Sequence, residues 1–95
     1  MTTGSNNTAV GHGALYQTGN STDNTGIGRL SLQRATGGAN TGLGGLSGNA
    51  ITTGANNITI GYQAATSGTN NLTTGSNNII IGSNAAASSA TVSNE

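Results

Sequence analysis

Five copies of one short pattern occupy this chain, and they constrain its fold more than any other feature of the sequence. In each copy an asparagine lies four residues before a glycine, a β-branched residue lies three before it, and an aliphatic residue lies one before it. Self-similarity at such a period is typical of repeat proteins, whose units bury their apolar faces against neighbouring units. The glycines, called anchor glycines below, follow one another at spacings of 17, 16, 17 and 21 residues: Gly11, Gly28, Gly44, Gly61 and Gly82.

The residues before each anchor glycine predict a short β-strand. Side chains two positions apart share one face of a strand, so the β-branched and aliphatic positions form one face and the residue between them points the other way. Because apolar side chains suit a buried face, we expect Ile79 and Ile81 of the last copy to face the coil interior. Ile80 should then face outward, against another chain. Gly82 should form the corner, since a Cβ would obstruct a tight turn there.

The repeated asparagines, called ladder asparagines below, are predicted to combine two structural roles. Identical amide side chains stack in register in β arrays, and asparagine also tolerates the left-handed backbone of turns. The small residue three positions after each anchor glycine indicates a tight corner. The ladder asparagines are Asn7, Asn24, Asn40, Asn57 and Asn78.

These patterns predict an all-β chain of stacked, parallel β-solenoid or β-roll-like repeats of about 17 residues. No segment shows the 3.6-residue apolar period of a helix. We expect one repeat domain over residues 1–95, with an exit segment, 87–95, that leads towards a C-terminal region missing from this sequence. The longest repeat holds extra residues, and we expect "TSGTNN" at 66–71 to bulge from the stack.

The composition favours self-association. Gly, Thr, Asn and Ser supply 57 of the 95 residues, whereas Leu, Ile and Val supply only 15. One slim coil can build little core from so few apolar side chains, so we expect an elongated homotrimer in which three chains share an apolar axis. A disordered low-complexity linker is the alternative that this composition leaves open.

Charge and residue types exclude several function classes. The only charged residues are Arg29, Arg34, Asp23 and Glu95, so there is no basic surface for nucleic acid. No apolar run is long enough to insert into a membrane. The chain has one histidine, one aspartate and no cysteine, so we expect no catalytic residues, no metal site, no cofactor and no enzymatic activity.

One position per repeat tolerates any residue and should face outward. It directly follows the anchor glycine and holds His12, Arg29, Gly45, Tyr62 and Ser83. Tyrosine and arginine are frequent contact residues in interfaces, so His12, Arg29 and Tyr62 are the candidates for a receptor-facing row. A plain solvated edge or a seam between subunits is the competing interpretation, and the sequence favours it.

Units such as "TGSNNTAVGHGAL" (3–15) and "TGANNITIGYQA" (53–64) resemble the repeats of phage tail fibres that end in an intramolecular chaperone of the endosialidase type. They are more distantly similar to the head repeats of trimeric autotransporter adhesins. The resemblance implies a structural segment of a trimeric viral tail fibre, located in the extracellular virion tail, that supports host-cell attachment. Its implied partners are two identical chains, other tail or fibre proteins, and a host surface receptor such as a glycan. The head of a bacterial surface adhesin is the alternative.

Overall fold

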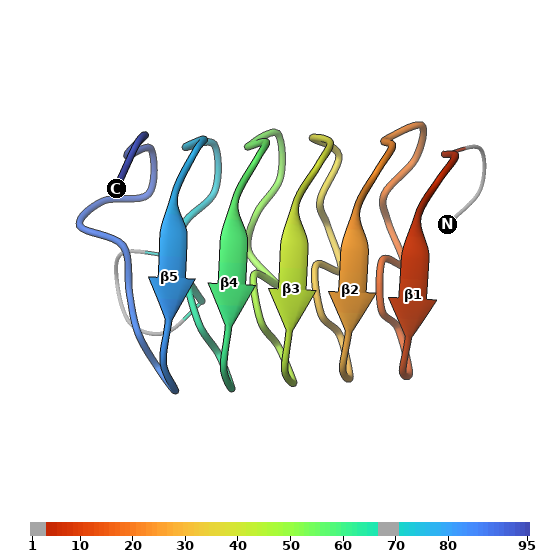
Figure 1. Cartoon of the computed structure of the whole chain (residues 1–95), viewed down its shortest axis with the longest axis horizontal. Helices are drawn as coiled ribbons and strands as arrows, with labels where there is room; N and C mark the ends of the chain where they lie inside the picture. Colours follow the sequence, from red (N-terminus) through yellow and green to blue (C-terminus); the bar gives the residue numbers. More distant parts are fainter. Residues whose placement is uncertain (1–3, 67–70) are drawn as a thin grey trace.

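The chain folds into a parallel β-solenoid of about four turns, each of about 17 residues. A computed structural model describes residues 4–66 and 71–95, so most of the predicted bulge lies outside the described residues. One parallel sheet runs along the stack with its strands in sequence order (Figure 1). The strands are β1 (Thr8–Val10), β2 (Thr25–Ile27), β3 (Thr41–Leu43), β4 (Ile58–Ile60) and β5 (Ile79–Ile81). The predicted all-β fold of stacked parallel repeats is confirmed.

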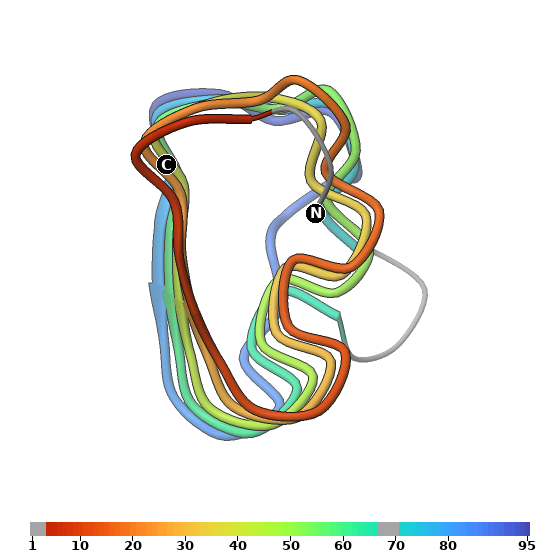
Figure 2. The ribbon, with the colours of Figure 1, turned by 90° about the vertical axis from the view of Figure 1, so that its right-hand side faces the viewer.

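Each coil closes within the single chain, and equivalent residues stack in register. Thr8 pairs with Thr25, which pairs with Thr41, and the same register continues to β5. Viewed along the stack, successive coils superimpose (Figure 2). The molecule measures 32 × 21 × 16 Å along its principal axes.

The anchor glycines form the predicted corner. Their φ angles lie between 121° and 135°, a region that side chains with a Cβ rarely adopt. A Cβ on Gly28 would lie 2.5 Å from the carbonyl oxygen of Gly44 in the next coil. The corner closes as a turn, because the amide of the small residue three positions later bonds the glycine carbonyl, as Ser31 does to Gly28 at 3.2 Å.

The residue before each ladder asparagine makes a second turn. It has a left-handed backbone in every described coil, with φ between 58° and 62°. Asparagine and aspartate tolerate this conformation because their short polar side chains bond locally. The two predicted roles thus occur at one corner but on adjacent residues: the first residue of each pair turns, and the second stacks. The turn residues are Asn6, Asp23, Ala39, Asn56, Asn77 and Asn94.

The strands face the opposite way from the prediction. Ile80 is 6% exposed and belongs to the hydrophobic core, whereas Ile79 and Ile81 are 60% and 63% exposed. The middle residues of β2 to β5 are buried inside the coil, opposite apolar side chains from the facing wall. Leu15 and Leu32 from that wall are fully buried.

The interior is filled by a size match between neighbouring coils. A Cβ on Gly42 in the middle of β3 would lie 2.8 Å from Cγ of Leu32, so the large side chain requires a glycine opposite it. Where the facing wall carries the smaller side chain of Ala65, the middle position of the next strand carries the large side chain of Ile80. Close packing of this kind explains why the inward position varies from glycine to isoleucine.

The C-terminal segment stacks on the coil before it. Residues 91–95, "TVSNE", stack on residues 74–78, "TGSNN", so the exit segment continues the solenoid. The amide of Asn94 donates to the carbonyl of Ser76 at 2.9 Å. The backbone amide of Glu95 donates to Oδ1 of Asn78 at 2.7 Å, the bond that a ladder asparagine would make. Hydrogen bonds from Ser88, through its side chain and then its backbone amide, hold the pKa of Glu95 below its usual value.

Candidate functional site

The outward face of the sheet is apolar and is called the assembly face below. Its ten positions, one and three residues before each anchor glycine, hold only threonine and aliphatic residues. Six of its seven large apolar side chains are 37% to 63% exposed. The large exposed members are Val10, Ile27, Leu43, Ile58, Ile79 and Ile81, and Ile60 is half-buried between them.

This face is a continuous stripe, because the parallel register aligns equivalent positions along the stack. Ile27 lies beside Leu43, which lies beside Ile60. Burying a half-exposed aliphatic side chain contributes roughly 1 kcal/mol, so the six large exposed members offer about 6 kcal/mol per chain. Contiguous exposed apolar surface of this kind marks an interaction site. The assembly face is therefore the strongest candidate for a functional surface.

The ladder asparagines are structural and fully occupied. Oδ1 of Asn40 accepts from the backbone amide of Asn57 at 3.0 Å, and Oδ1 of Asn57 accepts from that of Asn78 at 3.1 Å. Their Nδ2 groups donate as well, to a backbone carbonyl in four copies, as Asn57 does to Gly75 at 2.9 Å, and to the Ser21 hydroxyl in the case of Asn24. In the described part of the chain, every buried side-chain nitrogen and oxygen has a partner. The ladder amides thus bond backbone groups that would otherwise need water, and these buried amides are not available to a ligand.

The structure places the predicted receptor-facing residues on one exposed row beside the corner. His12 and Arg29 are exposed, and Tyr62 is 51% exposed. The ring of Tyr62 leans over Gly45, whose Cβ would lie 3.4 Å from Cδ2 of the tyrosine. The row does not converge on one site, because Arg29 and Tyr62 are separated by a full coil. A receptor contact by these three residues stays a prediction.

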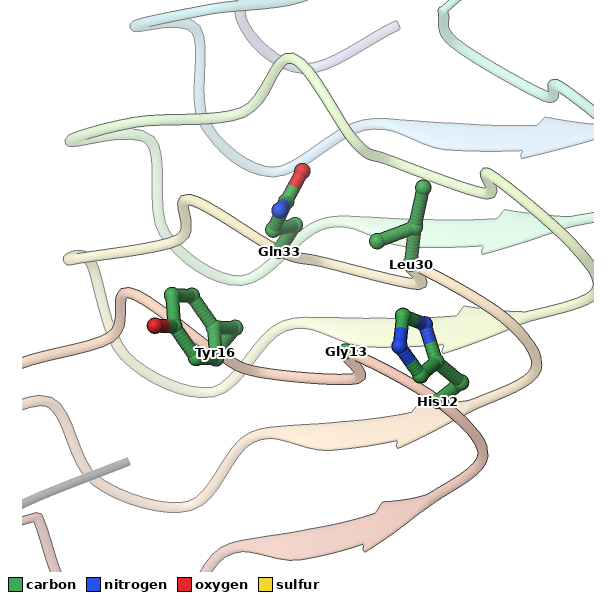
Figure 3. Close-up of a pocket in the computed structure, with 5 residues that line it drawn as sticks. All are labelled: His12, Gly13, Tyr16, Leu30 and Gln33. Carbon is green, nitrogen blue, oxygen red and sulfur yellow. The ribbon is translucent and has the colours of Figure 1, made fainter.

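A groove lies on the first two coils, on the return path of the chain, which is the part of each coil that follows the anchor glycine and leads back towards the next strand. Figure 3 shows the side chains that line it, drawn in front of the strands. The hollow has a volume of about 460 Å³ and is open to solvent. Of its residues only His12 was among the predicted site residues. The lining residues are His12, Gly13, Tyr16, Leu30 and Gln33.

Other site types find no support in the described residues. No group of three histidine, cysteine, aspartate or glutamate side chains within residues 4–66 and 71–95 could hold a metal ion. A search of the same residues finds no helix with the length and apolar character needed to cross a membrane.

Comparison with protein-family models, with curated proteins and with solved structures finds no match to this chain. The fold itself defines the class of protein, which is a parallel β-solenoid with one apolar sheet face.

Proposed function

We propose that this chain is a structural segment of a trimeric viral tail fibre that supports host-cell attachment in the extracellular virion tail. The observation that carries the proposal is the assembly face, which exposes aliphatic side chains along the whole stack. The tail-fibre resemblance of the repeats supplies the number of chains and the biological setting. A bacterial surface adhesin head is the second candidate, since its repeats also resemble this chain.

The geometry suits a parallel bundle. The assembly face runs along the 32 Å axis of the solenoid, on one side of the coil (Figures 1 and 2). Three chains related by a threefold axis parallel to the stack would each turn this face inward and keep their N-termini at one end. Such symmetry closes without open growth. It also adds the apolar burial that one slim coil lacks, so folding and association would stabilise each other.

The bonding along the backbone suits a stiff shaft. Neighbouring coils are bonded in both directions: Thr25 donates to Asn40 of the next coil at 2.8 Å, and Gly28 donates to Val10 of the preceding coil at 2.7 Å. Because these bonds run along the stack, bending the solenoid would strain many of them at once. A rigid rod that holds three copies of a weak contact close together raises their effective concentration at a host surface.

The test is the mass of the full chain in solution. Sedimentation equilibrium should give three times the chain mass of 9.1 kDa. Leu43→Glu, which adds a charge in the middle of the assembly face, should shift the sample to monomer. Thr53→Glu, at an exposed position outside the assembly face, is the matched control and should stay trimeric. A folded wild-type chain with a monomer mass would overturn the trimer.

A further inference from the structure

We infer that the groove on the first two coils binds a neutral pyranose sugar. The inference rests on the proposed attachment function for its biological setting, but its geometry lies within one chain. The lining residues follow the anchor glycines on the return path, whereas the assembly face is formed by the strands (Figure 3). Assembly through the strands and ligand binding in the groove are therefore separable.

The floor of the groove exists because of one glycine. Gly13 occupies the second position after the anchor glycine, where the next coils carry Leu30, Leu46, Gln63 and Asn84. The side chain of Leu30 leans over this position, and a Cβ on Gly13 would lie 2.6 Å from its Cδ2. The absence of a side chain at Gly13 therefore leaves a hollow whose base is the apolar surface of Leu30. The hollow is a feature of the first coil and is not part of the general repeat.

Two ring side chains flank the floor. Tyr16 is 64% exposed and His12 is exposed, and Figure 3 shows them on either side of Gly13. A tyrosine ring offers a large apolar face that loses little conformational entropy on binding. The C–H face of a pyranose ring is apolar and flat, so it can pack on such a ring while its hydroxyl groups point outward.

A prearranged amide supplies polar contacts above the floor. Oε1 of Gln33 accepts from Nδ2 of Asn49 at 3.0 Å, and the same Nδ2 donates to the carbonyl of Leu30 at 3.0 Å. Asn49 thus fixes the Gln33 amide through its oxygen and leaves the NH₂ group as a donor. The imidazole of His12 adds two ring nitrogens, of which one donates and one accepts when the ring is uncharged. A mixed set of donors and acceptors matches hydroxyl groups, which act as both.

Charge and size narrow the ligand class. None of the five lining residues is an arginine, lysine, aspartate or glutamate, so the lining itself offers no permanently charged partner for a phosphate or a carboxylate. Its volume of about 460 Å³ lies in the range of small-molecule sites. Its openness to solvent suits one or two units of a longer surface glycan better than an enclosed metabolite.

The experiment is an NMR titration of the full ¹⁵N-labelled chain with neutral methyl glycosides of glucose, galactose, mannose and N-acetylglucosamine. Methyl glucuronide is the acidic comparison. At least one neutral sugar should shift the amide signals of Gly13, Tyr16 and Gln33 with millimolar affinity. Tyr16→Ala should weaken this binding about tenfold, because the stacking face is lost. Tyr62→Ala, an exposed tyrosine outside the groove, is the matched control and should bind like the wild type.

The outcomes separate this inference from the proposed function. Tyr16→Ala should retain the wild-type mass in sedimentation, because its side chain lies outside the assembly face. The inference is overturned if no neutral sugar shifts these signals, if the glucuronide binds tighter than every neutral sugar, or if Tyr62→Ala weakens binding as much as Tyr16→Ala. A monomer mass with intact sugar binding would instead overturn the trimer alone.

Discussion

Two adjacent isoleucines allow a direct test of which side of the sheet faces the coil interior. Ile80 is 6% exposed and lies in the core, whereas Ile81 is 63% exposed on the assembly face. Replacing each of them by alanine removes the same three carbon atoms from adjacent positions of β5. Ile80→Ala should therefore lower the stability of the folded chain itself, whereas Ile81→Ala should weaken the association of chains.

The magnitudes follow from these exposures. In Ile80→Ala, losing three buried carbons costs about 2.4 kcal/mol in transfer free energy, and a cavity of about 80 Å³ adds about 2 kcal/mol where the walls do not collapse. The unfolding free energy should thus fall by about 4 kcal/mol, which lowers the melting temperature by roughly 20 °C for a domain of this size. In Ile81→Ala, only the exposed part of the side chain can be buried by association, and its burial contributes about 1.5 kcal/mol per chain. The variant lacks this contribution only when the chains are associated.

The assay is thermal unfolding followed by circular dichroism over a hundredfold range of protein concentration. Ile80→Ala should melt well below the wild type at every concentration. Ile81→Ala should show its loss mainly where the wild type is assembled, and should weaken assembly by about 4.5 kcal/mol summed over three chains. The reverse pattern, in which Ile81→Ala loses more stability at the lowest concentration, would refute the orientation of the strands.

Two further predictions concern the backbone of the coil. Asn57→Ala should lower the unfolding free energy by about 3 kcal/mol, because it leaves buried ladder partners unsatisfied, while Asn56→Ala should cost about 1 kcal/mol or less, since Ala39 already occupies the equivalent left-handed turn. Chemical denaturation measures both, and equal losses would show that the ladder bonds contribute little. Gly54→Ala should prevent folding or shift the melting temperature by more than 10 °C, because its Cβ would overlap a carbonyl of the next coil. Gly19→Ala meets nothing within 4 Å and should cost only the roughly 1 kcal/mol of a left-handed alanine, so a comparable loss there would contradict the stacking argument.

The repeat in the sequence predicted the strands, the corner and the ladder, because each depends on a local rule that recurs in all five copies. Period-two alternation defines two faces of a strand, but it does not say which face is inside. The usual preference for apolar residues inside gave the wrong answer for Ile80 and its neighbours. The deciding fact is non-local: leucines such as Leu15 and Leu32 fill the coil from the opposite wall.

The groove could not be predicted from the repeat rules. Tyr16 and Gln33 both lie five residues after an anchor glycine, a position that follows no common chemical rule. They become neighbours only because one coil is 17 residues long at this point, which brings equivalent positions together. Once the period is known, aligning this position between copies would have placed an aromatic ring beside an amide. The missing signal was therefore the floor at Gly13, which depends on how Leu30 leans.

Within the strands, the position with the most constant chemistry lies on the outside, and this supports identical chains as the partners. The residue before the anchor glycine is aliphatic in all five copies although four of the five are exposed, whereas the inward residue ranges from Gly26 to Ile80. A row of aliphatic side chains that recurs once per coil, at the spacing of about 4.8 Å between parallel strands, needs a covering surface with the same repeat. An unrelated globular partner has no such period, but a second and a third copy of this solenoid in parallel do. The pitch that aligns Ile27 with Leu43 within one chain would then also set the register between chains.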